Sequence, residues 1–500
     1  MLVDLLVAEI GSTVTKVHAF DRIETAGPLW LGGGAAPTSV GGGDVTIGLR
    51  AAMTALGQVL GRPVEGRRML AASSAAGGLR MSVHGLVRDM TVRAAREAAL
   101  GAGAVLVSVT SGALTSSDEE NLGRKRPGVI LLAGGVEGGD RAIIVGNARA
   151  IVASGVAAPV IYAGNSDARA EAVAILEGGG LKVRAVPNVY PRLDQLDIEP
   201  TRRAIQEVFE EHIVTAPGME RVRDLVGGTI WPTPGAVMES AAALREILGD
   251  LVVVDVGGAT TDVHSVTQGS AEIMRLQIHP EPVAKRTVEG DLGVYVNAAN
   301  VVRLAGEEEV AAYMTELAGS RATARTAQAT GQAPTFNSAA VRDILAGLHP
   351  LAPEDTEPEA SVFVEALARI AAETAIVRHV GRLRHLFGPT GRITVAEGKD
   401  LTEVECLIGT GGPLTRFPRA LATLSKLATL TPAVVEARTR RAEGGAGSAA
   451  LSAGASGYHL LPGRGVRPVL DKNYLLAVLG VLHHEYPEAA VSLLRDDFGR

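Results

Sequence analysis

Two short stretches of the chain carry an acid, glycines and hydroxyl residues in the same order. They are residues 5–20 (LLVAEIGSTVTKVHAF) and residues 251–266 (LVVVDVGGATTDVHSV). In each stretch an apolar run ends at a carboxylate, Glu9 or Asp255, and a turn of small residues follows. A carboxylate at that place can hold Mg²⁺ through water, and glycine lets a turn present its backbone N–H groups to an anion. The pattern predicts a site for a metal ion and phosphate groups.

A single glycine-rich turn between strands is usually only a turn, so the duplication carries the prediction. Each copy opens roughly half of a 500-residue chain, which favours a duplicated domain that holds a nucleoside triphosphate between its halves. The residues predicted to contact the phosphates are Gly11, Ser12, Thr13 and Lys16 in the first copy and Gly257, Gly258, Thr260 and Thr261 in the second.

The elements around these turns follow from apolar periodicity and turn residues. Uninterrupted apolar runs of this length predict strands buried on both faces. Residues 128–187 alternate between strand and helix patterns, which predicts a parallel sheet. We expect residues 32–43 to be irregular, and we expect helices over 44–60, 236–248, 288–304 and 365–386, the first capped by Asp44.

At these motifs the chain resembles the actin, Hsp70 and sugar-kinase superfamily of ATPases. Within it, the sequence is similar to the ATP-dependent accessory, or reactivating, proteins of adenosylcobalamin-dependent enzymes of the glutamate mutase and aminomutase type. That family is called MutL and is unrelated to the mismatch-repair protein. The segments that carry the resemblance are AEIGST (8–13), GDVTIG (43–48), LLAGGVEGGD (131–140), YAGN (162–165), DVGGATTDVHSV (255–266), RTVEGDLG (286–293), IGTGGPL (408–414) and LDKNYLLAVLGVL (470–482).

The resemblance implies an α/β protein with the actin-like ATPase fold, in which two duplicated ribonuclease-H-like domains surround a nucleotide cleft. It implies a first half over residues 1–245, with an inserted α/β region at about 128–190, and a second half over 246–442. Residues 443–500 are then a linker and a C-terminal extension. The implied cofactors are ATP and Mg²⁺.

The resemblance also assigns roles to individual residues. Asp255 and Glu9 are expected at the metal and the reacting phosphate, although the superfamily commonly has aspartate where this chain has Glu9. Asp262 is either a further Mg²⁺ contact or a solvated residue, and Lys16 either reaches a β- or γ-phosphate or lies at the surface. Glu239 is a guess for the residue that positions the attacking water, because no general base stands out.

Further nucleotide contacts are expected after the second hairpin. Glu289 lies in the RTVEGDLG segment. The turn IGTGGPL resembles the superfamily's adenosine motif, in which a bare glycine backbone lies against the purine or ribose. The residues assigned to it are Gly409, Gly411 and Gly412.

Composition limits the alternatives. The net charge of −7 and a pI near 5.9 argue against a general nucleic-acid surface, which is usually basic. One cysteine, Cys406, excludes an intramolecular disulfide and a cysteine-ligated metal site within the chain. The N-terminus lacks a basic segment before its apolar run, and no apolar stretch approaches the ~18 to 20 residues of a membrane helix. We expect a cytoplasmic protein that binds no membrane.

The resemblance implies an ATPase that releases damaged cobalamin from an adenosylcobalamin-dependent mutase or aminomutase. A small-molecule kinase of the same fold is the main alternative, although no convincing substrate-side acid is visible. An ATP-driven electron donor of acyl-CoA dehydratases would need two cysteines per subunit, and an actin-like scaffold would form nucleotide-dependent filaments. The sequence leaves the client mutase and the oligomeric state open, a homodimer included.

Overall fold

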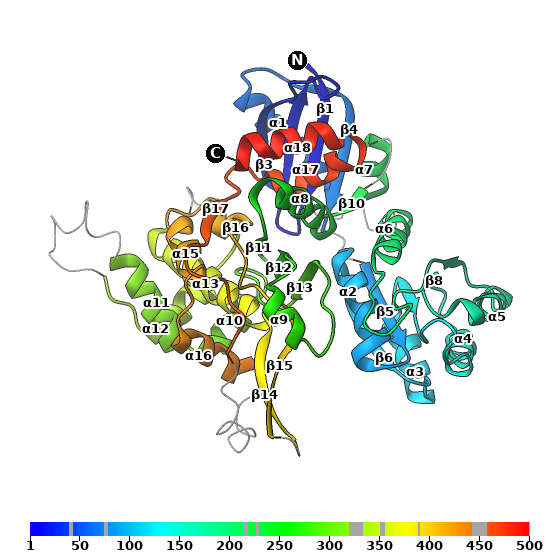
Figure 1. The fold of residues 1–500 in the computed structure, drawn as a ribbon. Helices are drawn as coiled ribbons and strands as arrows, with labels where there is room; N and C mark the ends of the chain where they lie inside the picture. The colour runs from blue at the N-terminus through cyan, green and yellow to red at the C-terminus, as the bar shows by residue number, and fades with distance from the viewer. Residues whose placement is uncertain are drawn as a thin grey trace. The chain divides into compact units, whose positions relative to one another are not determined.

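The computed structural model describes residues 1–39, 44–74, 79–213, 219–226, 230–319, 334–350, 356–388, 391–442 and 458–499. The chain divides into two compact units. Unit 1 comprises Met1–Ser240, His279–Lys285 and Ala477–Asp496, and unit 2 comprises Ala241–Ile278, Arg286–Leu476 and Asp497–Arg500. The chain therefore passes between the units several times, and the C-terminal helices belong mostly to the unit that contains the N-terminus (Figure 1).

The first sheet is built around the N-terminal hairpin. Its strands are β1 (Leu2–Ile10), β2 (Val14–Asp21), β3 (Leu29–Pro37), β4 (Glu65–Ser73) and β10 (Ile230–Pro232). They lie in the order β10-β4-β1-β2-β3. β2 is antiparallel to β1 and β3, whereas β4 is parallel to both β1 and β10. The glycines at 32–34 belong to β3, so the prediction that residues 32–43 are irregular is wrong for 32–37. Glycine suits this strand because a side chain at Gly34 would overlap the backbone of the neighbouring helix α1 (Val45–Val59).

The second sheet repeats this order around the second hairpin. Its strands are β11 (Leu251–Val256), β12 (Thr261–Val266), β13 (Ala284–Glu289), β16 (Cys406–Thr410) and β17 (Arg467–Leu470). They lie in the order β13-β12-β11-β16-β17, with β11 antiparallel to β12 and parallel to β16. In both sheets a meander of three strands is followed by two parallel strands on the far side of the first. This is the ribonuclease-H-like arrangement, so the predicted duplicated α/β fold is confirmed.

A third sheet is inserted between β4 and β10. Its strands are β5 (Leu79–Gly85), β6 (Ala104–Ser111), β7 (Val129–Leu132), β8 (Val160–Tyr162) and β9 (Val183–Ala185), in the order β6-β5-β7-β8-β9. Neighbouring strands of this sheet pair in parallel, as predicted for its later strands. The sheet already begins at Leu79, before the start at residue 128 that the sequence suggested. Residues 88–92 form a single π-helical turn that leads into α2 (Arg93–Gly101).

Helices complete both units. In unit 1 and at its borders they are α3 (Ser116–Lys125), α4 (Ala142–Ala153), α5 (Ser166–Gly178), α6 (Glu199–Ile213), α7 (Met219–Val226), α8 (Thr233–Leu248), α17 (Leu475–Glu485) and α18 (Pro487–Phe498). In unit 2 they are α9 (Ala271–Leu276), α10 (Ala298–Ala305), α11 (Glu307–Gly319), α12 (Ser338–Ala346), α13 (Pro358–His379), α14 (Gly412–Thr415), α15 (Ala420–Leu427) and α16 (Pro432–Ala442). α13 lies at the centre of the hydrophobic core of unit 2, and most of its side chains are buried.

Helices α8 and α17 pack closely. A methyl group added at Gly480 of α17 would overlap the carbonyl oxygen of Ala236 in α8. Both residues belong to unit 1. The border between the units falls inside each of these two helices, after Ser240 in α8 and after Leu476 in α17.

Two predicted helices are wrong in part. The stretch 288–304 begins as the end of β13 and becomes helical only from Ala298, because Gly293 must lie directly against the backbone of Ala259. The stretch 365–386 is helical to His379, after which residues 382–388 form β14 and pair with β15 (Gly391–Glu397). Asp44 caps α1 as predicted, since its carboxylate accepts a hydrogen bond from the amide of Thr46 at 2.9 Å.

The predicted linker at 443–457 and most of the predicted loop at 319–338 lie outside the described residues. No helix among the described residues is long and apolar enough to cross a membrane.

Candidate functional site

In the first hairpin the predicted acid is paired with the predicted lysine. Glu9, near the end of β1, stands directly opposite Lys16 on β2, and Nζ of Lys16 lies 3.0 Å from Oε2 of Glu9. Both side chains are largely buried. The turn between the strands is closed by a hydrogen bond of 3.0 Å from the amide of Gly11 to the carbonyl of Val14. The antiparallel register therefore places the cation beside the acid, which the sequence separation alone did not reveal.

The second hairpin has the same register but a different arrangement of charge. Asp255 on β11 stands opposite Asp262 on β12, and the amide of Gly257 closes the turn by donating to Thr260 at 2.9 Å. Asp262 accepts a hydrogen bond from Nε of the buried Arg286 at 2.7 Å. The position that holds a lysine in the first copy thus holds an acid in the second, and Arg286 neutralises it.

Each turn is held from one side by a neighbouring segment. In the first, Thr38 donates its amide to Thr13 at 2.9 Å and its hydroxyl to the carbonyl of Gly11 at 2.8 Å. In the second, the amides of residues 294–296 donate to the carbonyls of Gly257 and Gly258, and Nδ2 of Asn297 donates to Ala259 at 2.7 Å.

The hydrogen bonds from these segments go to the carbonyl groups of the turns and do not involve all of the turn amides. Within the described parts of the chain, no protein acceptor takes a hydrogen bond from the amides of Ser12, Thr13, Gly258 and Ala259. Consecutive free N–H groups of this kind are what an anion-binding nest requires.

The glycine turn assigned to the adenosine motif adjoins the second hairpin. It follows β16, which runs parallel to β11 with Thr410 in register with Asp255. Gly411 has φ +84°, and a methyl group there would overlap the carbonyl oxygen of Val256 and lie 2.7 Å from Oδ1 of Asp255. The sheet therefore brings Asp255 and this turn together at the carboxyl ends of two neighbouring strands, where ligands gather in open α/β sheets.

Several residues near this turn were not predicted from the sequence. Asp471 is buried and accepts hydrogen bonds from the hydroxyl of Thr410 at 2.8 Å and from the amides that begin α17. Desolvation raises the pKa of Asp471 to about 6, although its hydrogen bonds act in the opposite direction. The guanidinium of Arg416 lies 5.4 Å from the ring centre of Tyr474, and a side chain at Gly412 would meet the hydroxyl of Tyr474. The sequence signal for Asp471 and Tyr474 was the LDKNYLLAVLGVL segment, to which no role was assigned.

Three other residues that were predicted to act at the site have contacts of a different kind. Glu239 lies in the unit 1 part of α8, where its Oε1 is 3.5 Å from Nη2 of Arg202. Glu289 ends β13 and forms an ion pair with Arg378, while burial raises the pKa of its carboxyl group. Gly409 lies within β16 against Leu424, so its lack of a side chain serves packing.

The donors present suit a magnesium ion that keeps most of its water. Among the described residues there is no group of three or more histidine, cysteine or acidic side chains that could hold a metal. Mg²⁺ in nucleotide sites typically needs only one or two protein carboxylates together with phosphates and water. In unit 2, Asp255 is a suitable donor, whereas the ion pair with Arg286 does not favour Asp262 as a direct ligand. In unit 1, Glu9 is likewise engaged, in its ion pair with Lys16.

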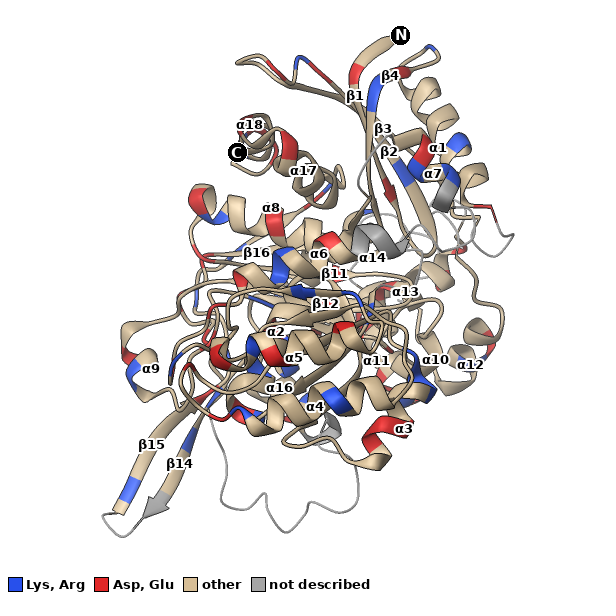
Figure 2. Cartoon of the chain, turned by 90° about the vertical axis from the view of Figure 1, so that its right-hand side faces the viewer, with Lys and Arg blue, Asp and Glu red and all other residues tan. Residues whose placement is uncertain are grey.

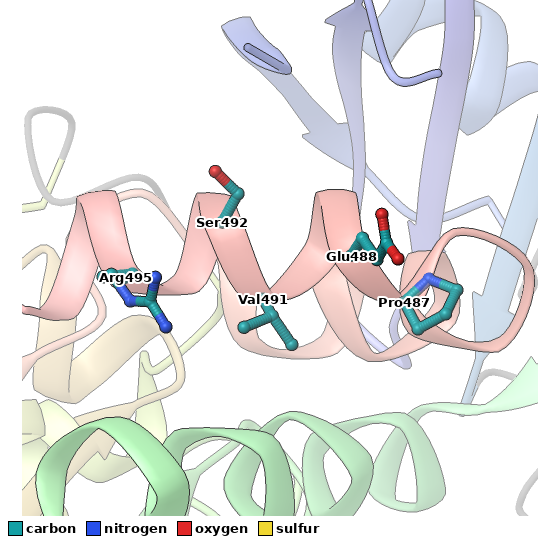
Figure 3. A pocket seen from close by; sticks show the side chains of 5 residues that line it. All are labelled: Pro487, Glu488, Val491, Ser492 and Arg495. Atoms are coloured by element: carbon teal, nitrogen blue, oxygen red, sulfur yellow. The ribbon is translucent and has the colours of Figure 1, made fainter. Parts of the chain in front are cut away.

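A shallow hollow of about 350 Å³ lies elsewhere, along α18. Pro487, Glu488, Val491, Ser492 and Arg495 line it, all from one helix (Figure 3). None of the residues predicted to bind nucleotide belongs to it, so we do not include it in the candidate site.

Known proteins match this chain over almost its whole length. A family described as MutL protein matches residues 5–498. The protein named MutL from Clostridium tetanomorphum is 35% identical over 499 residues, which cover 98% of each chain. This match agrees with the family predicted from the motifs.

The solved structures that align with this chain have low TM-scores and low sequence identity. Nucleotide-free acetone carboxylase aligns with a TM-score of 0.31 and 12% identity, over 79% of this chain and 81% of its own. Component A of (R)-2-hydroxyglutaryl-CoA dehydratase from Acidaminococcus fermentans aligns with a TM-score of 0.28 and 10% identity, over 98% and 99%. Because these scores are low, the fold assignment depends on the strand order of the two sheets.

Proposed function

The chain belongs to the MutL protein family, and on that premise we propose that it is an ATPase that reactivates an adenosylcobalamin-dependent mutase or aminomutase. In this role it would bind the partner enzyme after its coenzyme has been damaged. ATP binding and hydrolysis would then drive release of the damaged cobalamin, so that intact coenzyme can enter. The family resemblance of the motifs supports the choice of partner.

One observation carries the ATPase part of the proposal. Two sheets with the same strand order each place an acid at the end of the first strand, directly before a turn with free amides. A fold that needed only stability would not require both features to be repeated in register. Each such turn has donors that suit phosphate oxygens and a carboxylate that suits a hydrated magnesium ion.

In this proposal each group of residues has its own role at the nucleotide. The amides of both turns would orient the phosphate groups, and Lys16 would add a positive charge beside Glu9. Asp255 and Glu9 would hold the magnesium ion, which when bound neutralises charge on the phosphates. Bare backbone at Gly411 and Gly412 would allow close approach of the nucleoside. Phosphoryl transfer depends mainly on such positioning and electrostatics, so a slow ATPase needs no strong general base.

The direct test is phosphate release from Mg-ATP by the purified protein. We would measure it alone, with candidate sugars, and with a B12-dependent mutase that has been inactivated by its own turnover. Turnover coupled to recovery of mutase activity is the expected result. Turnover that needs a small acceptor and leaves it phosphorylated would make the protein a kinase, and nucleotide-dependent light scattering would indicate a filament-forming scaffold.

Substitution of Asp255 tests the site. Asp255→Ala should lower the rate of ATP hydrolysis at least ~100-fold, in the range seen when one electrostatic stabiliser of a transition state is removed, while thermal unfolding stays cooperative. The matched control is Asp224→Ala, which removes an exposed acid from α7. Wild-type turnover in the Asp255 variant would remove this residue from the proposed metal site.

A further inference from the structure

The two-stranded sheet of unit 2 forms a projecting ribbon. Strands β14 and β15, here called the ribbon, pair antiparallel over their whole length, from Arg382 opposite Glu397 to Gly388 opposite Gly391. Its base is attached to unit 2 by two backbone hydrogen bonds, from Leu383 to the carbonyl of Tyr458 at 2.8 Å and from Ile278 to the carbonyl of Ala396 at 3.0 Å. Among the described residues no third strand joins the sheet. Both views show the ribbon extending outward from unit 2 (Figures 1 and 2).

The ribbon carries an apolar pair on an exposed face. Leu386 and Ile393 stand directly opposite each other and are 46% and 51% exposed. Because side chains alternate along a strand, they share this face with Arg384 and Val395. The opposite face is polar at the same level, since Nδ1 of His385 lies 3.1 Å from the hydroxyl of Thr394.

The pairing of its two strands gives the ribbon little stability of its own. A two-stranded hairpin is marginally stable in water and needs a third strand or a packing partner. Leu386 and Ile393 do not belong to the hydrophobic core of unit 2, whereas Leu383 at the base packs against it. The exposed apolar pair therefore contributes little to the stability of unit 2 and is available to a partner.

The charge of the ribbon indicates what kind of partner fits. Residues 382–397 contain Arg382, Arg384 and Arg392 against Glu397, a formal charge of +3 − 1 = +2 on a chain whose net charge is −7. Glu397 forms an ion pair with Arg384 at 2.7 Å, so the excess charge comes from Arg382 and Arg392. Figure 2 shows basic residues on both strands. A surface that binds nucleic acid depends on many phosphate contacts. Two excess positive charges around an apolar centre are too few for that role. They match a protein surface with an apolar patch and an acidic rim.

We propose that the ribbon docks this protein onto its client mutase, with Leu386 and Ile393 buried in an apolar patch and the arginines facing acidic residues around it. This inference rests on the proposed function, because that function names the partner. Apolar side chains at the centre of an interface carry most of the affinity, and charges at the rim mainly set the association rate and its salt dependence.

The test is the affinity of the full-length protein for a purified glutamate mutase and a purified aminomutase, each inactivated by its own turnover, measured by biolayer interferometry at two salt concentrations. Leu386→Glu with Ile393→Glu should weaken binding at least ~10-fold. Arg384→Glu, which reverses an exposed charge and breaks its ion pair with Glu397, should slow association, and the effect should shrink at high salt. The matched control is Val59→Glu with Leu193→Glu, since these apolar residues are 64% and 70% exposed outside the ribbon. Thermal melting checks that each variant is folded.

The outcomes separate this inference from the proposed function. If the wild type and all variants bind the mutase equally well, the ribbon proposal is wrong and the reactivase proposal stands. If the wild type binds neither of the two inactivated enzymes, both proposals fail. If the ribbon variants change sedimentation of the protein alone and leave mutase binding unaltered, the ribbon joins two copies of this chain, and the proposal of a mutase dock is overturned.

Discussion

Replacing Gly411 by alanine is the sharpest test of how the second sheet builds the candidate site. Gly411 has φ +84° and ψ 153°, a backbone region that is essentially restricted to glycine. An added methyl group would also overlap the carbonyl oxygen of Val256 and lie 2.7 Å from Oδ1 of Asp255. The substitution therefore disturbs the turn and the acid together.

The expected magnitude has two parts. Backbone strain of this kind costs about 1–3 kcal/mol, and inserting a methyl group into a filled space costs about 1–3 kcal/mol more. A destabilisation of about 4 kcal/mol is therefore expected. For a unit of this size, each kcal/mol lowers the melting temperature by about 2–4 °C, so the transition of unit 2 should fall by roughly 8–16 °C.

The neighbouring glycine provides a matched control. At Gly412 the nearest atom to an added methyl group is the hydroxyl of Tyr474 at 3.6 Å, an ordinary contact, and φ is not in the positive range. Calorimetry should show a large shift for Gly411→Ala and little shift for Gly412→Ala. If the two variants melt within ~2 °C of each other, the turn is not built as described. A loss of nucleotide affinity in Gly412→Ala without loss of stability would support its proposed contact with the nucleoside.

Two further predictions concern buried charges of unit 2. Burial raises the pKa of Asp471 to about 6, so the folded state binds the proton more tightly than the unfolded chain. Lowering the pH from 7 to 4 should then stabilise the wild type by roughly 2.4 kcal/mol relative to Asp471→Asn. Urea unfolding at both pH values measures this difference, and a pH-independent difference would contradict the raised pKa. Arg286→Met should destabilise the fold by about 3–5 kcal/mol, because it leaves Asp262 as an uncompensated buried charge. Adding Asp262→Asn should recover much of that loss, and a single variant as stable as the wild type would refute the pairing.

Much of the fold could be predicted because local patterns repeat. The aligned apolar runs before Glu9 and Asp255 predicted two hairpins, and the structure gives both the same register. The alternation of strands and helices in 128–187 likewise predicted a parallel sheet. These features depend on neighbouring residues in the sequence, so composition and spacing were sufficient.

The errors arose where contacts between distant residues decided the outcome. Residues 382–388 look helical when they follow α13, but pairing with residues 391–397 makes them a strand. Residues 294–296 hold the second turn by backbone hydrogen bonds, which no periodicity can reveal. For the same reason the inserted sheet was predicted to begin too late, since β5 pairs with strands that follow it in the chain.

The sequence by itself determined the family, the two acid-bearing turns and the duplicated α/β fold, because each depends on residues that are contiguous in the chain. Only the tertiary structure decided what each acid faces. Glu9 pairs with Lys16 across one hairpin, and Asp262 is neutralised by Arg286 from a strand that begins twenty-two residues further along the chain. Asp255 lies beside the glycine turn of a strand more than a hundred residues away. Charges act through distance in space, so their partners become visible only when the chain is folded.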